Sequence, residues 1–464
     1  MPPPAPFRGR CLRNDDLKID PRDALLYALI LCGSLVRMVM PFVHNPLDHR
    51  WSDPGRWWGY TGTGVDTPPL ALIDPVFYQA WLSFIAKFTL DIPVLVALYA
   101  GLLSALTPWL WYRFLRELLP GKRRALLGWA ILAWLPSWIG IYGYFMTETL
   151  LLPLLGLALW LSWRSARKGE VGPFVLAALV WTVAGLTRGV AAPLAAAVMG
   201  FLWLQQRDKF AGALLTGLLI VAILGFTGYR NLEKSGQFAP LGQPSLNEAY
   251  AKSGRMEIHV HYTSEQSGIG FLYGFGSPSM NQAIFAPFSD WTPSRRGRFD
   301  AHIDLDHQAR SWRAAIDQAV AQNPLPVARL RLENLAQLLF GPSWPDANPA
   351  YLFDRLSTAM RFLWAPLLPI VIGLLIRRIL RGDRRCAPPL LAALLLWLAV
   401  QGLSLIGVNE GRYRKPIEGV LIAGLLLGAT RPTRKTESQT GSSGTRPARG
   451  LTVTAHTPNV RSTT

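Results

Sequence analysis

The chain has 464 residues, of which 50% are hydrophobic and 16% charged, and its formal net charge is +18. Soluble domains carry about 25% charged residues, so the composition argues against a string of soluble domains, and the apolar content excludes a disordered basic protein. Apolar runs of about 20 residues recur, which is the length that a helix needs to cross a bilayer. The sequence therefore predicts a polytopic membrane protein.

Ten apolar windows bounded by charged residues predict an all-α polytopic fold with about ten transmembrane helices. The windows are residues 24–43, 91–112, 125–145, 148–163, 171–187, 189–206, 211–228, 358–376, 388–408 and 416–429. Basic residues precede the first window, follow the second and then mark every second connection. By the positive-inside rule both termini are cytoplasmic, and we expect a multi-pass protein of the bacterial inner (plasma) membrane. Most of the positive charge is thus a topology signal, which disfavours a nucleic-acid partner.

Composition divides the chain further. We expect a cytoplasmic N-terminal segment (1–23), a membrane domain (24–228) with a long first outer loop (44–90), an extracytoplasmic loop domain (229–357) inserted between spans seven and eight, C-terminal membrane helices (358–430) and a tail (431–464). The tail is rich in Ser, Thr, Gly, Arg and Pro and is predicted to be disordered in the cytoplasm. The N-terminus lacks a signal-peptide layout, so we expect the first span to be retained. The three cysteines offer neither a disulfide framework nor a thiolate metal site.

The first outer loop contains two informative stretches. In residues 73–90, aromatic and aliphatic side chains recur at three- and four-residue spacing, which predicts an amphipathic helix in the membrane interface. The stretch HNPLDHRWSDPGRWW places His49 and Asp53 ahead of a short helix that opens at Pro54 or Gly55. Asp53 is then either the N-cap of this helix or a carboxylate that removes a proton from an acceptor hydroxyl or amine.

Two further charged residues are predicted at the same membrane face. Glu148 lies at the outer start of the fourth span, where an acidic residue also suits the helix dipole. Arg188 lies between spans five and six, on the side that topology arginines avoid. A lone Arg beside an apolar segment either snorkels to the interface or meets an anion such as a lipid phosphate.

The stretch NEGRYRKPIEG carries Arg412, Arg414 and Lys415 in a short outer loop, which should contain few basic residues. Guanidinium groups bind phosphate oxygens bidentately, so this cluster suits a lipid-linked phosphate. Salt bridges to Glu410 or Glu418 are the competing structural explanation.

The long loop at 229–357 is less informative. MEIHVHY alternates like a surface strand, with His259 and His261 on one face. These histidines, and a second group around His302 and Asp304, are weak candidates for metal ligands. Two helical patterns lie within residues 308–340.

The string Asp53-Pro54-Gly55-Arg56-Trp57-Trp58 and the aromatic-rich helix after it resemble the first outer loop of the GT-C superfamily of membrane glycosyltransferases. The chain is most similar to protein O-mannosyltransferases and lipid A aminoarabinose transferases. The string Arg-Tyr-Arg-x-Pro-Ile-Glu at 412–418 resembles the C-terminal motif of the same enzymes. The resemblance covers about residues 24–210 and 310–428, and the loop at 229–310 lies outside it.

The resemblance implies transfer of a sugar from a polyprenyl-phosphate donor to an extracytoplasmic lipid, glycan or protein acceptor, by inverting displacement. Asp53 would be the general base, with Glu148 and His49 orienting the substrates. The donor phosphate would be bound by Arg188, Arg412, Arg414 and Lys415. Other substrate contacts would come from Arg56, Trp57, Tyr78, Glu410 and Glu418. No cofactor is implied with certainty; some relatives use a divalent cation, although Pro54 here replaces the second acidic residue that many relatives carry.

Two alternatives stay open. A transporter or lipid flippase would place ionisable groups at mid-membrane and show repeated halves. Here Arg37 and Arg361 are the only basic residues placed within predicted spans, and the other candidates gather at one face. A non-catalytic membrane scaffold subunit would tolerate changes of these charges.

Overall fold

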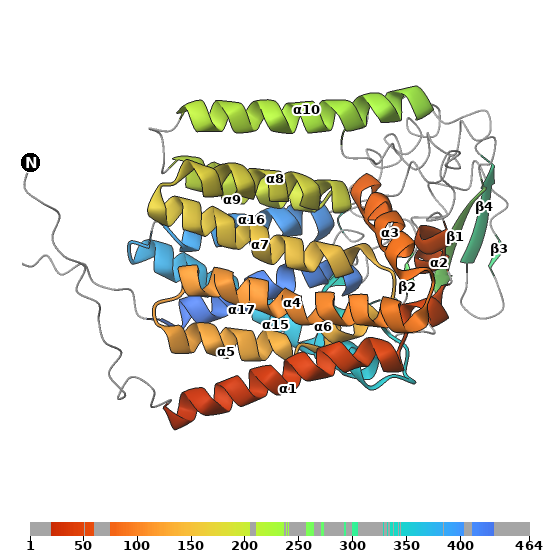
Figure 1. Ribbon diagram of the computed structural model, residues 1–464, viewed down its shortest axis with the longest axis horizontal. Helices are drawn as coiled ribbons and strands as arrows, with labels where there is room; N and C mark the ends of the chain where they lie inside the picture. Colours follow the sequence, from red (N-terminus) through yellow and green to blue (C-terminus); the bar gives the residue numbers. More distant parts are fainter. Residues whose placement is uncertain are drawn as a thin grey trace, which may run out of the picture. The chain divides into compact units, whose positions relative to one another are not determined.

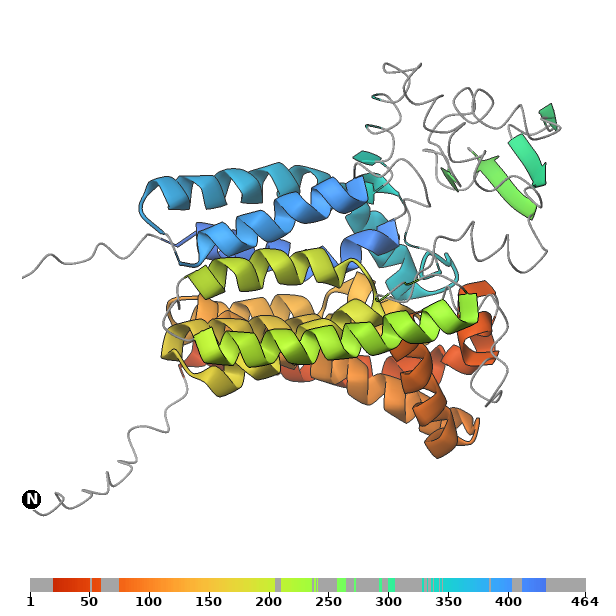
Figure 2. The ribbon, with the colours of Figure 1, turned by 90° about the horizontal axis from the view of Figure 1, so that it is seen from above.

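The computed structural model of the chain describes residues 20–50, 52–59, 75–204, 210–235, 345–383, 385–402 and 411–430, with short pieces between residues 238 and 343. Its main feature is a bundle of helices packed side by side (Figures 1 and 2). The helices are α1 (Pro21–Val43), α4 (Pro93–Leu118), α5 (Lys122–Ala133), α6 (Pro136–Gly140), α7 (Thr147–Lys168), α8 (Val171–Thr187), α9 (Ala191–Leu204), α10 (Phe210–Ser235), α15 (Leu352–Leu380), α16 (Ala387–Trp397) with the π-helical turn η7 (Leu398–Gly402), and α17 (Lys415–Gly428).

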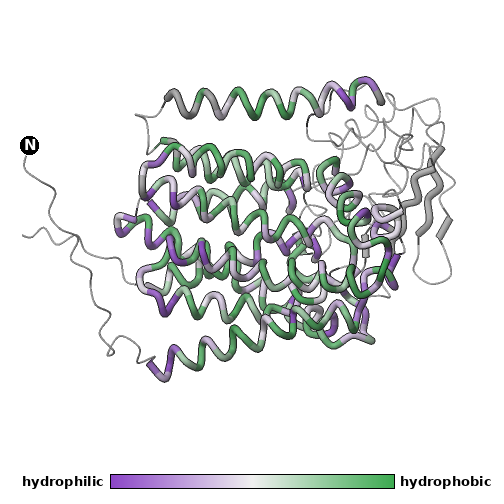
Figure 3. The backbone as a smooth tube through the Cα atoms, viewed as in Figure 1, coloured by the Kyte–Doolittle hydropathy of each residue, from purple (hydrophilic) through white to green (hydrophobic). Residues whose placement is uncertain are grey.

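Each predicted transmembrane window overlaps one of these helices. Among the residues that the structure describes, four helices, α1, α4, α7 and α15, are long and apolar enough to cross a membrane, and α5 with α6 gives a fifth candidate that bends by 57°. Figure 3 shows hydrophobic residues along the middle of the bundle helices and hydrophilic ones near their ends. The chain is therefore a membrane protein with several apolar helices, and the count of ten spans stays a prediction.

The first outer loop folds into η2 (Pro46–His49), α2 (Ser52–Gly59) and α3 (Val76–Thr89). The helix predicted within residues 73–90 is confirmed as α3, which buries Tyr78, Leu82 and Ile85 and leaves Phe84 and Phe88 exposed, while its place in the membrane interface stays a prediction. Helix α2 begins at Ser52, earlier than predicted, so Asp53 lies in its first turn and is not its N-cap. The loop therefore carries Asp53 on a short helix at one end of the bundle.

The described pieces of the long loop at 229–357 include the strands β1 (Glu257–Thr263), β2 (Phe271–Leu272), β3 (Thr292–Pro293) and β4 (Phe299–Asp304). They form an antiparallel sheet in the order β2-β1-β4-β3, and the strand predicted from MEIHVHY is confirmed as β1. The register pairs His259 with His302 and His261 with Asp300. The membrane part is helical, whereas this insertion includes strands. The helices predicted within 308–340 and the predicted tail lie largely outside the described residues.

Arg37 joins α1 to the break between α5 and α6. Its fully buried guanidinium donates to the carbonyl oxygens of Ala133 (2.8 Å), Leu132 (2.7 Å) and Trp138 (3.1 Å), and to Ser104. The last carbonyls of a helix have no partner within the helix, and inside a bilayer no water can replace one. Arg37 therefore satisfies the end of α5 where the span is broken, which accounts for a basic residue within a predicted span.

We expect Arg37→Met to lower the free energy of unfolding by about 3 kcal/mol or more, because several buried carbonyl groups lose their donor together. Thermal unfolding of the purified protein in detergent measures the change. Arg22→Met is the matched control, since Arg22 lies exposed in the first turn of the same helix. Equal stability of the two variants would contradict a capping role for Arg37.

Candidate active site

The first turn of α7 holds a buried carboxylate, Glu148, whose side chain has no exposed surface. One of its oxygens forms an ion pair with Arg188, the residue that follows α8. The other accepts a hydrogen bond from the Thr147 hydroxyl at 3.0 Å. The Nε atom of Arg412 lies 3.7 Å from the first oxygen. Burial of a charge is costly unless it is paired, and here two guanidinium groups supply that pairing.

Arg412 also connects Glu148 to the first outer loop. It lies in the short 3-10 helix η8 (Gly411–Arg414), and its Nη1 atom is 3.4 Å from the Oδ2 atom of Asp53. The Arg412 side chain is 9% exposed and that of Asp53 is 23% exposed. Two carboxylates and two guanidinium groups, predicted from four separate stretches of sequence, therefore meet here. We refer to Asp53, Glu148, Arg188 and Arg412 as the ion-pair group.

Tyr413 lies against both arginines of this group. The guanidinium carbon of Arg188 is 4.5 Å from the centre of its ring, and that of Arg412 is 5.1 Å away. Arg412 also donates to the Tyr413 hydroxyl at 3.3 Å. Aromatic rings attract cations and keep planar guanidinium groups oriented. Sequence reasoning missed this role, although Tyr413 stands between the two arginines of the quoted motif.

The other two cations of the predicted phosphate cluster turn into the protein. Arg414 contacts Glu418 at 3.3 Å and donates to the carbonyl oxygens of Leu338 and Leu339. Lys415 donates to Asp346 at 2.5 Å and to the carbonyl oxygen of Ser137 at 2.7 Å. Both side chains are at most 2% exposed. The predicted trio is therefore divided, with Arg412 alone in the ion-pair group and the salt bridge to Glu418 formed by Arg414.

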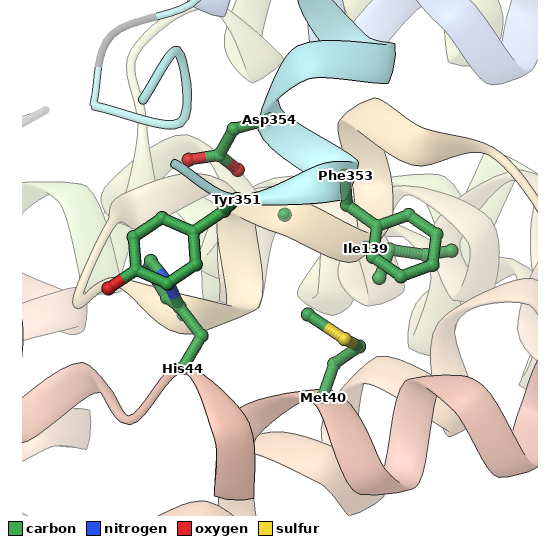
Figure 4. Close-up of a pocket in the computed structure, with 8 residues that line it drawn as sticks. Met40, His44, Ile139, Tyr351, Phe353 and Asp354 are labelled. Atoms are coloured by element: carbon green, nitrogen blue, oxygen red, sulfur yellow. The ribbon is translucent and has the colours of Figure 1, made fainter. Parts of the chain in front are cut away.

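His49 lies with a group of aromatic residues. Its ring stacks on His44 at 4.0 Å between centroids and lies near Tyr144 and Tyr351. Burial lowers the pKa of His49 below its usual value, although the nearby charge of Asp48 acts in the opposite direction. The structure thus places His49 in this group of rings, of which His44 and Tyr351 are drawn in Figure 4.

The remaining predicted substrate residues occupy different surroundings. Trp57 packs edge-on against Tyr78 with 5.4 Å between ring centres, and Tyr78 is fully buried with its hydroxyl 3.5 Å from that of Thr149. Glu418 accepts a hydrogen bond from Ser137 in addition to its contact with Arg414. The side chain of Arg56 and all of Glu410 lie outside the described residues.

Among the residues whose side chains are described, no group of three His, Cys, Asp or Glu residues could hold a metal ion. Asp53 and Glu148 both face guanidinium groups. A divalent cation placed between these two carboxylates would meet two positive charges, so the ion-pair group is a poor match for one.

Residues 74–228 match the family model of dolichyl-phosphate-mannose-protein mannosyltransferases. This segment runs from just before α3 into α10 and contains Glu148 and Arg188, whereas Asp53 and Arg412 lie outside it. Over these residues the chain is similar to that family of mannosyltransferases. The match agrees with the resemblance to membrane glycosyltransferases that the sequence motifs indicate.

Solved structures of the oligosaccharyltransferase AglB from Archaeoglobus fulgidus are also similar to this chain. The complex of AglB with an inhibitory peptide and a dolichol-phosphate shares 13% sequence identity at a TM-score of 0.48, covering 88% of this chain and 50% of AglB. The apo form shares 12% identity at a TM-score of 0.46, covering 87% and 50%. This chain thus spans about half the length of AglB. No curated protein matched the sequence.

The buried ion pair between Lys415 and Asp346 can be tested for a role in stability. We expect Lys415→Met alone to reduce the free energy of unfolding by about 3–5 kcal/mol, because the Asp346 carboxylate loses its cation. Adding Asp346→Leu should restore much of this loss, since an apolar pair of similar volume needs no partner. Thermal unfolding of the wild type, the single variant and the double variant provides the comparison. A single variant that stays fully stable yet loses donor affinity would instead favour a phosphate-binding lysine.

Proposed function

We propose that the chain is an integral membrane glycosyltransferase of the bacterial inner membrane, with cytoplasmic termini, that transfers a sugar from a polyprenyl-phosphate donor to an acceptor at the extracytoplasmic face. The observation that carries this proposal is the position of Arg412 within 3.7 Å of Glu148 and 3.4 Å of Asp53. Acidic and basic groups of the kind that sugar transfer from a phosphate needs are thereby gathered at one end of the bundle.

In this mechanism an oxygen or nitrogen of the acceptor attacks the anomeric carbon of the donor sugar. The bond from that carbon to the phosphate oxygen breaks, and the configuration inverts. Asp53 takes the proton from the acceptor, and the lipid phosphate departs with the electron pair. Negative charge grows on the phosphate in the transition state, so cations that face it stabilise the transition state more than the bound donor. We assign this role to Arg412 and Arg188.

The contacts of Arg412 suggest how donor binding prepares the base. A phosphate binds a guanidinium through two parallel hydrogen bonds and would compete with Asp53 for Arg412. The contact to Asp53 is the more exposed one, whereas Glu148 is fully buried between Arg188 and Arg412. Donor phosphate would therefore replace Asp53 and leave Glu148 in place. Arg412 would then no longer hold Asp53, while Glu148 keeps both arginines oriented.

The internal contacts narrow the list of proposed substrate-binding residues. Three of these residues already have partners inside the protein: Arg414 contacts Glu418 and a backbone carbonyl, and Lys415 contacts Asp346. We therefore propose that Arg414, Lys415 and Glu418 stabilise η8 and α17. Trp57 and Tyr78 support the loop that carries Asp53. His49 is proposed to contact the acceptor side of the site, because it lies on the same loop four residues before Asp53.

Asp53→Asn should lower turnover by about 10²–10⁴-fold, since the amide cannot accept the acceptor proton. The donor Michaelis constant should not rise, because the substitution removes a competitor of the phosphate for Arg412. The assay measures sugar transfer from a polyprenyl-phosphate donor by the purified, folded protein. Asp48→Asn, an exposed change in the same loop, is the control and should retain full activity. Full activity of Asp53→Asn would exclude a base at this position.

Arg412→Ala should lower turnover by about 10²–10³-fold and weaken donor binding, because a group that stabilises the leaving phosphate is lost. Arg412→Lys should recover only part of the activity, since lysine keeps the charge but loses the bidentate geometry. Steady-state kinetics with varied donor separates the two parameters. Arg355→Ala, an exposed change at the start of α15, serves as the control. A scaffold subunit without catalysis would show no transfer in the wild type and no sensitivity to these changes.

A further inference from the structure

The antiparallel sheet in the long loop brings together two groups of residues that are far apart in the sequence. Strand β1 carries EIHVHYT and strand β4 carries FDAHID, and the two strands lie side by side (Figure 1). Three rows of this ladder consist of residue types that bind metal ions, namely Glu257 opposite Asp304, His259 opposite His302 and His261 opposite Asp300. The register thus joins the two weak candidates for metal ligands that the sequence offers separately.

The alternation of the two strands assigns all of these residues to one face of the sheet. Successive residues of a strand belong to opposite faces, and residues directly opposite each other in an antiparallel pair belong to the same face. The alternate rows pair apolar residues, which are Ile258 with Ile303, Val260 with Ala301 and Tyr262 with Phe299. A register shifted by one residue would set apolar residues opposite polar ones, so the sequence itself supports the observed pairing. We call the face with the His, Asp and Glu residues the ligand face.

The pairing on the ligand face is unfavourable unless a cation binds there. Antiparallel strands are stabilised by opposite charges or apolar groups across from each other, and like charges directly opposite destabilise them. Glu257 and Asp304 are both acidic and share one row. His259 and His302 share the next row and would repel each other if both were protonated. A divalent cation attracts carboxylates and binds neutral imidazoles, so it removes both sources of repulsion.

Two neighbouring rows of the ligand face have the spacing of a single metal site. Residues directly opposite each other are about 5 Å apart, and residues two apart along one strand are about 7 Å apart. Four such positions form a rectangle whose centre is about 4 Å from each corner. A zinc–nitrogen bond of about 2 Å and the length of an imidazole ring cover this distance. The corners of the rectangle are His259, His302, His261 and Asp300.

The ligand types select the metal. Ca²⁺ and Mg²⁺ prefer oxygen ligands, whereas imidazole nitrogen is typical of Zn²⁺ and related transition metals. Three imidazoles and one carboxylate provide the four ligands of the tetrahedral geometry that Zn²⁺ adopts. Zn²⁺ with one carboxylate keeps a net positive charge, and the neighbouring row of Glu257 and Asp304 supplies negative charge next to it. The composition of the ligand face therefore favours Zn²⁺.

We propose that the ligand face binds one Zn²⁺ ion through His259, His261, His302 and Asp300. The ion connects two strands that residues 264–298 separate in the sequence, and a metal that closes a long loop stabilises a chain most. Strands β2 and β3 have two residues each, and a sheet with so little pairing is marginally stable in water by itself. Zn²⁺ thus stabilises the sheet of the long loop, and this role does not depend on the proposed function.

The test measures Zn²⁺ binding by the full-length protein, without an affinity tag, in detergent after a chelator has removed bound metal. Isothermal titration calorimetry should show one Zn²⁺ per chain with a Kd of about 1 μM or lower. His259→Ala and His302→Ala, one from each strand, should each raise this Kd by about 100-fold or more, because each removes a ligand. X-ray absorption at the zinc edge should show imidazole among ligands at about 2.0–2.2 Å.

His307→Ala is the matched control. His307 lies beyond the end of β4 and is close to His302 in the sequence. A metal site made from the sequence neighbours of His302 would need it, whereas a site made by the register of β1 and β4 does not. This variant should therefore bind Zn²⁺ as the wild type does, and excess Mg²⁺ or Ca²⁺ should leave Zn²⁺ bound.

Four results would overturn the zinc proposal: Zn²⁺ binds the wild type only in the millimolar range, neither His259→Ala nor His302→Ala raises the Kd, His307→Ala raises it as much as they do, or Mg²⁺ or Ca²⁺ displaces Zn²⁺. Thermal unfolding compares each variant with the zinc-free wild type. A variant that is less stable than this reference is replaced by Asp300→Asn, which should raise the Kd by about tenfold or more. An unchanged Kd of Asp300→Asn would then decide against the site.

Discussion

The pairing of the Glu148 carboxylate determines how the chain is arranged at the end of the bundle where α7 begins. A fully buried carboxylate at the start of a membrane helix needs cations that are themselves fixed. Arg188 comes from the end of α8 and Arg412 from η8, more than 200 residues further along the chain. Both must lie at Glu148 for the charge to be tolerated. The start of α7, the end of α8 and the helix η8 therefore lie together because the Glu148 charge must be paired. Asp53 of the first loop joins them through its contact with Arg412.

The need to pair buried charges divides the basic residues at this end of the bundle into two kinds, those with partners inside the protein and those in the ion-pair group. Arg414 and Lys415 meet carboxylates and carbonyl oxygens inside the protein and can be understood without a ligand. Arg412 and Arg188 face carboxylates and the ring of Tyr413 at the end of the bundle. Neighbours in sequence thus have different functions, because a 3-10 turn followed by a helix directs successive side chains to different sides. A cluster of like charges in a sequence is therefore weak evidence for one common binding site.

The sequence was sufficient for the positions of the helices and for the choice of the four residues of the ion-pair group. Apolar windows located the helices because the bilayer fixes both their length and their composition. Arg188 and Arg412 could be chosen because a basic residue on the predicted outer side departs from the usual pattern. Asp53 and Glu148 were chosen from their places in the first loop and at the start of a span, together with the resemblance to GT-C enzymes. What the sequence could not provide was the pairing of these charges. The partner of Lys415 is Asp346 and that of Arg37 is the end of α5, contacts that no local pattern encodes.

The ion-pair group also sets a condition for any anion that binds at this end of the bundle. Arg412 already lies 3.4 Å from Asp53 and 3.7 Å from Glu148, and Arg188 is paired with Glu148. Under the proposed function, the donor phosphate would compete with Asp53 for Arg412, because that contact is more exposed than the contact with the fully buried Glu148. Donor binding and the orientation of the proposed base would therefore be linked through a single guanidinium group.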